Sequence, residues 1–176
     1  SDGYQGIDVH LLHNQKEAIQ FYNKNNIPNK YVIQKYHPGP FEVGLYYIRI
    51  PYKQSGYIFN LVLKKDPLLV KKQKWEPLMC HKTNNCTRQI NWITPQLTKV
   101  IDNISVNIPN FYIGRYDIRF ENLDDFKNGK NFIILELNTT NASPSIKGLQ
   151  NYTYSNSEII KYKILRIYIS ILTRLI

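Results

Sequence analysis

The stretch Gly114-Arg115-Tyr116-Asp117-Ile118-Arg119 predicts one β-strand, and Leu135-Glu136-Leu137-Asn138 predicts a second strand after a polar connection. Side chains alternate between the two faces of a strand, so Arg115, Asp117 and Arg119 share one face of the first. Glu136 and Asn138 share one face of the second by the same rule. The connection, residues 121–130, contains a short helical segment and an Asn-Gly turn. We therefore expect two neighbouring strands whose polar side chains meet at one spot.

The second strand has an apolar pattern that predicts which of its faces is buried. Alternation places one set of apolar residues on the buried face and a mixed set on the other. The expected buried set is Ile133, Leu135 and Leu137, and the expected opposite set is Ile134, Glu136 and Asn138. The polar pair therefore lies at the end of a strand, where binding sites are often built.

The polar groups at this spot suit a metal ion with a bound phosphate. Asp117 and Glu136 supply carboxylates and Asn138 supplies an amide oxygen, and magnesium prefers hard oxygen ligands of this kind. Arginine stabilises charge on phosphoryl groups, so Arg115 is expected to face the transferring group. Arg119 lies further along the same face and is expected to be structural. The alternative is a solvated sheet face on which Arg115 simply pairs with a neighbouring carboxylate.

The two strands resemble the metal-binding end of the ATP-grasp fold, the superfamily of D-alanine–D-alanine ligase and biotin carboxylase. In that superfamily an Arg-x-Asp strand and a Glu-x-Asn strand hold magnesium ions between the phosphates of ATP. The wording of this chain is most similar to the carboxylate–amine-ligase type. The resemblance extends upstream through further short motifs in the family's order, over roughly residues 1–150.

The upstream motifs imply a role for each matching residue. Gly3 and Gly6 resemble the glycine-rich loop that approaches phosphates, and Glu42 resembles the acid that holds the ribose hydroxyls. The segment that grips adenine is matched by Gln34, Lys35 and Tyr36. Lys64 or Lys65 occupies the place of a phosphate-facing lysine. The two lysines alternate in direction, so only one of them can point inward. The resemblance implies a nucleotide-binding role for Lys64 and a catalytic role for Lys65 beside Arg115.

The resemblance implies an α+β, ATP-grasp fold in which two α+β subdomains hold the nucleotide between them. Residues 1–63 are expected to form the small lid-like subdomain, incomplete at its amino terminus. Residues 64–176 are expected to form the larger subdomain that carries the metal site. The family's upstream lysine and amino-terminal domain have no counterpart in this sequence. The chain is therefore expected to be a fragment of a longer ligase or a shortened relative.

The resemblance also implies a reaction. A substrate carboxylate attacks the γ-phosphate of ATP to give an acyl-phosphate, and an amine then displaces phosphate to form a C–N bond. The cofactors implied are ATP and Mg²⁺ or Mn²⁺, and the carboxylate and amine stay unidentified. One alternative is a catalytically inactive nucleotide-binding remnant. Another is a basic interaction module that binds nucleic acid or an anionic membrane.

Composition limits the choice of partner. The 176 residues include 23 basic and 13 acidic ones, giving a net charge of +10, and 43% are hydrophobic, which indicates a globular chain. A high positive charge is typical of nucleic-acid binding, but Lys, Asn, Ile and Tyr, which AT-rich codons encode, are all abundant. We therefore expect no nucleic-acid partner. Cys80 and Cys86, with His81 between them, are expected to be ordinary loop residues rather than a metal site or disulfide framework.

The carboxy-terminal segment from Ser157 is apolar but carries five charged residues, which argues against a spanning helix. Its apolar residues are too broadly spread for a simple amphipathic face. Burial against a further part of the protein is the favoured interpretation, and association with a membrane surface is the alternative. Because no signal peptide is visible, the expected compartment is cytoplasmic.

Local signals predict the remaining elements. Asn14 is expected to cap a helix over residues 15–25, and Thr94-Pro95 to begin a second one, whose apolar face contains Leu97 and Ile101. Strands are expected over residues 31–36, 41–50, 57–63, 111–120 and 132–138. Ser157 is expected to cap the closing helix. Residues 66–91 give no clear signal.

Overall fold

A computed structural model describes residues 10–24, 32–64, 87–139 and 156–174 of the chain. Its described part is α+β, as predicted. The helices are α1 (Gln15–Lys24), η1 (Ile90–Trp92, a 3₁₀ turn), α3 (Pro95–Val106), α4 (Leu123–Lys127) and α5 (Asn156–Leu172). The strands are β1 (Phe41–Ile48), β2 (Tyr57–Leu63), β3 (Thr87–Arg88), β4 (Ile113–Phe120) and β5 (Phe132–Asn138).

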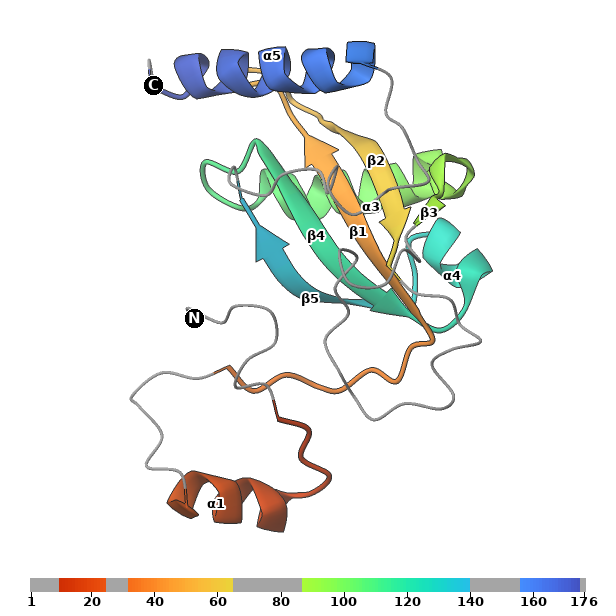
Figure 1. Ribbon diagram of the computed structural model, residues 1–176, viewed down its shortest axis with the longest axis vertical. Coiled ribbons are helices and arrows are strands. Elements are labelled where there is room, and N and C mark those ends of the chain that lie inside the picture. Colours follow the sequence, from red (N-terminus) through yellow and green to blue (C-terminus); the bar gives the residue numbers. More distant parts are fainter. Residues whose placement is uncertain (1–9, 25–31, 65–86, 140–155, 175–176) are drawn as a thin grey trace.

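The five strands form one sheet in the order β3-β2-β1-β4-β5, and each described pairing is antiparallel (Figure 1). The long central pair is β1 with β4, which runs from Phe41 opposite Phe120 to Ile48 opposite Ile113. The sequence predicts a subdomain boundary between residues 63 and 64. Strands β1 and β2, which precede it, lie in one sheet with β3, β4 and β5, which follow it. No break in the described sheet marks that division.

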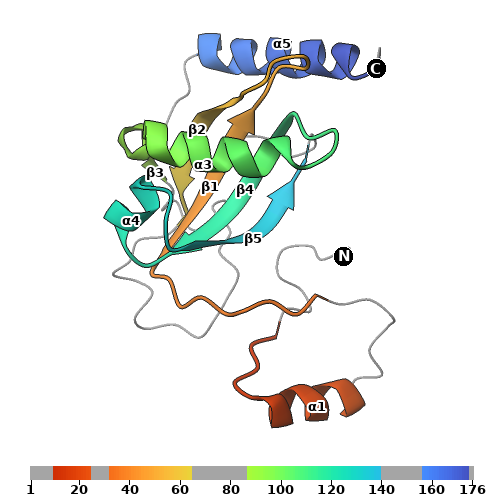
Figure 2. The same cartoon turned by 180° about the vertical axis from the view of Figure 1, so that it is seen from behind.

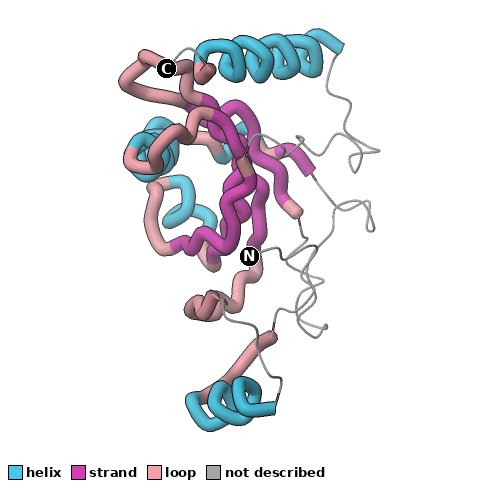
Figure 3. The backbone as a smooth tube through the Cα atoms, turned by 90° about the vertical axis from the view of Figure 1, so that its left-hand side faces the viewer, coloured by secondary structure: helices cyan, strands magenta, loops and turns pink. Residues whose placement is uncertain are grey.

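One face of the sheet packs against α3 and α4 and forms the main hydrophobic core (Figures 2 and 3). Alternate residues of β1 and β4 point to this side because of the two-residue period. They meet Leu97 and Ile101 of α3 and Phe126 of α4, all fully buried. The strand residues of this core include Val43, Leu45, Tyr47, Leu61, Leu63, Tyr116, Ile118 and Phe120. The other residues of these strands point to the opposite face, which carries the charged side chains.

The predicted caps are confirmed for α1 and α3. The Asn14 side chain accepts a hydrogen bond from the backbone nitrogen of Glu17 at 2.9 Å. The Thr94 hydroxyl accepts one from the backbone nitrogen of Leu97 at 3.1 Å, and Pro95 follows at the first helical position. The hydroxyl of Thr94 also donates to the carbonyl of Lys127. Thr94 thus joins the start of α3 to the end of α4.

The connection between β4 and β5 contains the predicted short helix, α4. Its cap is Asn122, whose side chain accepts from the backbone nitrogens of Asp124 and Asp125. Gly129 ends the turn with φ +70°, a left-handed conformation that favours glycine. A Cβ at Gly129 would lie 2.6 Å from the side chain of Val100, so glycine is required there for space as well.

The strand predicted over residues 31–36 is wrong for its described part. Residues 32–36 are extended and exposed but lie in no sheet ladder. The β-branched residues Val32 and Ile33, which favoured a strand, are 78% and 82% exposed. One side-chain hydrogen bond ties this segment to the sheet, from Gln34 Nε2 to the carbonyl of Ile134 at 2.6 Å. Propensity did not decide the outcome, because strand formation depends on pairing and burial.

The predicted faces of β5 are also corrected. A β-bulge interrupts the pairing, since Asp117 lies opposite Glu136 while Ile118 lies opposite Ile134. The extra residue, Leu135, lets Ile134 and Leu137 both pack against the main core. Ile134 therefore does not share a face with Glu136 and Asn138. Sequence alternation cannot show a bulge, because it assumes an uninterrupted two-residue period.

We expect Thr94→Val to lower the free energy of unfolding by about 1–2 kcal/mol, because it removes a helix cap and the bond to Lys127. Thr98→Val makes the same chemical change within α3 away from the cap and is expected to alter stability by about 0.5 kcal/mol or less. Urea unfolding of both variants measures the difference. Equal effects of the two substitutions would contradict the assigned role of Thr94.

Candidate functional site

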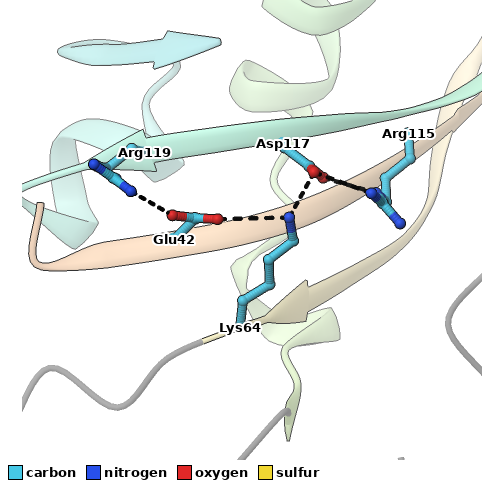
Figure 4. A network of polar contacts seen from close by, with 5 residues as sticks. All are labelled: Glu42, Lys64, Arg115, Asp117 and Arg119. Atoms are coloured by element: carbon cyan, nitrogen blue, oxygen red, sulfur yellow. Dashed lines mark hydrogen bonds and ion pairs between the residues drawn. The ribbon is translucent and has the colours of Figure 1, made fainter. Parts of the chain in front are cut away.

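The charged face of the sheet carries five ionised side chains that form one continuous network across three strands (Figure 4). In order along the network they are Arg119, Glu42, Lys64, Asp117 and Arg115. Each of these side chains is no more than 20% exposed. Removing charged groups from water costs free energy. A buried ion-pair network is therefore weak evidence that these residues stabilise the fold. Such clusters are typical of functional sites.

Strand register places these residues. In the β1–β4 pair, Glu42 lies opposite Arg119 and Gly44 lies opposite Asp117. Directly opposite residues of antiparallel strands have neighbouring side chains on the same face. Lys64 follows the end of β2 and its backbone nitrogen bonds to the carbonyl of Glu42 at 2.8 Å. The three strands therefore bring the five side chains together by regular pairing.

Asp117 is the centre of the network. Its Oδ1 atom accepts from Nε of Arg115 at 2.7 Å, and its Oδ2 atom accepts from a terminal nitrogen of Arg115 at 3.0 Å. Nζ of Lys64 lies 2.6 Å from the same Oδ2. Asp117 itself is 5% exposed. Both of its oxygens are thus engaged by cations.

Glu42 holds the other end of the network. Its two oxygens lie 2.7 Å from a terminal nitrogen of Arg119 and 3.6 Å from Nζ of Lys64. Arg119 also donates to the carbonyl of His37 at 3.2 Å. The structural role expected for Arg119 is supported by these contacts. Lys64 points onto the charged face, where it links the two carboxylates.

The environment of Arg115 stabilises its positive charge. Burial by itself would lower the pKa of the guanidinium, but the charge and hydrogen bonds of Asp117 more than offset it. Tyr46, opposite Arg115 in the sheet, acts in the same direction. The pKa of Arg115 is therefore raised, and the residue is a fixed cation at this spot.

The predicted meeting of β4 and β5 is confirmed. Arg115 lies opposite Asn138, and Asp117 lies opposite Glu136. With its amide nitrogen turned to Oε1 of Glu136 at 3.0 Å, Asn138 accepts from Arg115 at 3.3 Å. Asp117, Glu136 and Asn138 are therefore neighbours at the same end of the charged face, and Glu136 is exposed.

The fit of this donor set to a metal ion depends on the cations around it. Among the described residues, no group of three or more His, Cys, Asp or Glu side chains is placed to hold a metal. Asp117 and Glu136 supply two carboxylates and Asn138 completes the set with an amide. The set has the hard oxygens that magnesium prefers. Asp117 is shared with Lys64 and Arg115, so a metal alone must compete with two cations for it.

The remaining residues predicted for the nucleotide site lie partly within the described part of the chain and partly outside it. Gln34, Lys35 and Tyr36 are all exposed, and Gln34 lies beside β5 through its bond to Ile134. Glu42, expected to hold the ribose hydroxyls, lies inside the ion network. Gly3, Gly6 and Lys65 fall outside the described residues, as do Cys80 and Cys86. Their predicted roles stay predictions.

Sequence reasoning missed Gly44. It lies opposite Asp117, and a Cβ there would lie 3.2 Å from Cδ of Arg115 and 3.5 Å from Cε of Lys64. The absence of a side chain lets Lys64 cross β1 to reach Asp117 and leaves room for the side chain of Arg115. The available signal was a lone glycine inside a bulky strand, which often marks a close approach.

Comparison of the chain with protein-family models, with curated proteins and with solved structures returned no match. The site is therefore described by its own geometry.

We expect Asp117→Asn to lower the free energy of unfolding by about 3–5 kcal/mol, because it leaves Lys64 and Arg115 buried without their shared counter-charge. The double variant Asp117→Asn/Lys64→Met removes one of these cations and should regain part of the loss. Glu136→Gln, at an exposed position, should change stability by about 0.5 kcal/mol or less. Chemical denaturation compares the three. A loss no greater for Asp117→Asn than for Glu136→Gln would contradict the network.

His37 predicts a pH dependence of stability. Burial and then the charge of Arg119 lower its pKa from the ordinary 6.5. The unfolded chain therefore takes up a proton first as the pH falls through 6.5, and the folded state loses stability below that value. His37→Asn keeps an acceptor for the backbone nitrogen of Gly39, which bonds to His37 Nδ1 at 3.2 Å. Thermal unfolding from pH 7.5 down to pH 5 should show a shallower decline for His37→Asn than for the native chain, because the variant lacks the imidazole whose pKa is lowered in the folded state. Identical slopes would refute this.

Proposed function

We propose that this chain is the nucleotide- and metal-binding part of an ATP-grasp-type ligase that joins a carboxylate to an amine. One observation carries the proposal. Strand register sets Asp117 opposite Glu136 and Arg115 opposite Asn138, and a third strand brings Lys64 to the same spot. Hard oxygen donors and fixed cations thus lie side by side, which is what a metal–polyphosphate ligand requires.

The charges of the site favour such a paired ligand over either component alone. Three cations, Lys64, Arg115 and Arg119, face two buried carboxylates, Glu42 and Asp117, so the network has a net charge of +1 (3 − 2). A polyphosphate would take Lys64 and Arg115 as its counter-ions. That exchange would release the oxygens of Asp117, which could then join Glu136 and Asn138 around the metal. We therefore expect binding of the metal and of the nucleotide to be strongly coupled.

Each residue has a role in the proposed reaction. Magnesium, when bound, would offset the charge of the phosphate oxygens. Arg115 would stabilise the charge that develops on the transferred phosphoryl group, because its cationic form is secured by its surroundings. Lys64 would hold the phosphates from the opposite side of the site. Glu42 would keep Lys64 and Arg119 in position.

The proposed chemistry needs no protein nucleophile. The carboxylate substrate attacks the γ-phosphate of ATP and ADP leaves, and the amine then displaces phosphate from the acyl-phosphate to form the C–N bond. The fixed positive charge at Arg115 and Lys64 serves both steps, because charge develops on phosphoryl oxygens in the first and on the leaving phosphate in the second. The second candidate is a remnant that binds the nucleotide without turnover, and phosphate release distinguishes the two.

We expect ATP to bind the chain in a magnesium-dependent manner, and expect Glu136→Ala/Asn138→Ala to weaken that binding by about tenfold to a hundredfold through loss of two metal ligands. Calorimetric titration of ATP with and without magnesium measures this. The matched control Glu121→Ala/Asn103→Ala removes the same groups from exposed positions and should bind like the native chain.

Magnesium titrated without ATP should bind weakly, because Lys64 and Arg115 already neutralise Asp117. Binding of ATP that is indifferent to magnesium, or equal in the site variant and the control, would reject the proposed site. If ATP binds in a magnesium-dependent manner, phosphate release in the presence of candidate carboxylates and amines tests for ligase turnover.

A further inference from the structure

Within the described part of the chain, helix α5 packs on the sheet through one of its faces. Tyr162 and Ile169 are 6% and 2% exposed, and they pack with Ile48 of β1 and Ile113 of β4 in a second small core. The rings of Tyr162 and Phe59 lie 5.6 Å apart. The helix lies across the end of the sheet, away from α3 and α4 (Figures 1 and 3).

The opposite face of α5 is an exposed stripe of isoleucine. Successive helical residues are rotated by about 100°, so residues separated by four, three and four positions lie along one line. The stripe consists of Ile160, Ile164, Ile167 and Ile171, which are 53%, 60%, 60% and 54% exposed. It lies about half a turn from Tyr162 and Ile169. A contiguous apolar surface of this kind marks an interaction site.

Cations border the stripe. Lys161 lies on one side of it, and Lys163 and Arg174 lie on the other, and all three are exposed. Tyr168, 48% exposed, lies beside Lys161. The acidic residue of the helix, Glu158, is turned toward the body, where its carboxylate lies 2.9 Å from Arg88. The exposed side of α5 therefore presents isoleucine flanked by positive charge without a neighbouring carboxylate of its own helix.

The sequence alone favours burial of this helix against a further part of the protein, but the charges beside the stripe favour a lipid surface over a second copy of the chain. The four isoleucines have the spacing of a coiled-coil seam, but Lys161 and Lys163 would occupy the flanking positions that normally form ion pairs between helices. A second copy would place like charges against each other. A spanning role is also unsuitable, since no helix among the described residues is long and apolar enough to cross a membrane. An anionic lipid surface complements both the isoleucines and the cations.

We propose that α5 docks this protein on an anionic lipid surface, with the isoleucine stripe entering the boundary between headgroups and acyl chains. Lys161, Lys163 and Arg174 then contact the anionic headgroups. The opposite face of the helix keeps its packing on Ile48 and Ile113, so docking requires no unfolding of α5 from the body. The proposal is independent of the nucleotide site.

Flotation with lipid vesicles tests the proposal. The chain should float with phosphatidylcholine vesicles that contain about a third phosphatidylserine, and much less with phosphatidylcholine alone. Ile164→Ser/Ile167→Ser should weaken binding by at least about tenfold, through loss of buried apolar area. Ile19→Ser/Ile33→Ser changes two exposed isoleucines elsewhere, and should bind like the native chain.

A second pair of variants tests the charge. Lys161→Glu/Lys163→Glu should weaken binding by at least about 25-fold, since each cation near an anionic surface contributes roughly fivefold. Lys99→Glu/Lys130→Glu makes the same change in net charge at exposed positions away from α5, and should have a much smaller effect. Circular dichroism verifies that each variant is folded.

Three outcomes would overturn the proposal. They are equal binding to neutral and anionic vesicles, equal weakening by the α5 variants and their controls, and absence of vesicle binding by the native chain. Light scattering adds a fourth. A dimer that dissociates on Ile164→Ser/Ile167→Ser, without vesicle binding, would assign the stripe to a second copy instead.

Discussion

The pairing of β1 with β4 is the constraint on which the rest of this molecule depends. Each of these two strands contains both apolar and charged residues. Because directly paired residues of antiparallel strands point to the same side, the pairing gives the sheet one apolar face and one charged face. The apolar face receives α3 and α4 and forms the core. The charged face receives Lys64 from β2 and the polar end of β5. A slip of one residue in this pair would exchange Asp117 for a core residue and destroy both faces together.

Much of this arrangement follows from local rules. The caps at Asn14 and Thr94, the strands on either side of residues 53–56, and the approach of β5 to β4 are each set by a few neighbouring residues, and each is found in the structure. The two-residue period alone predicts that four side chains lie close together on one face, those of Arg115, Asp117, Glu136 and Asn138. Short-range signals agree with the tertiary structure in these places.

The rest depends on contacts that a single sequence does not display. The segment at residues 32–36 has strand-like residues, yet it finds no partner strand. The bulge at Leu135 alters the period of β5 and exchanges the face of Ile134. The pairing of Lys64 with both Asp117 and Glu42 requires the register of three strands at once. The role of Gly44 depends on two cations from other strands, Lys64 and Arg115, whose side chains pack over it.

Buried charge of this kind is costly to keep. Ion pairs removed from water seldom add more stability than well-packed apolar residues of similar size. A network with three cations around two carboxylates is therefore one reason for proposing a charged ligand at this site. Under the proposed function, this charge balance would couple the binding of a metal and a polyphosphate, because each would relieve a repulsion that the other would meet alone.

The bulge in β5 has a consequence for how this sequence varies among related chains. Because Leu135 is the unpaired residue, its deletion would leave Ile134 opposite Ile118 and Glu136 opposite Asp117, in an uninterrupted ladder. Loss of Leu137 would instead turn Asn138 toward α3. An alignment should therefore tolerate a one-residue gap at position 135 and resist one only two positions later. Gaps inside a strand are usually taken as alignment errors, but here one marks the place where strand length is free to change.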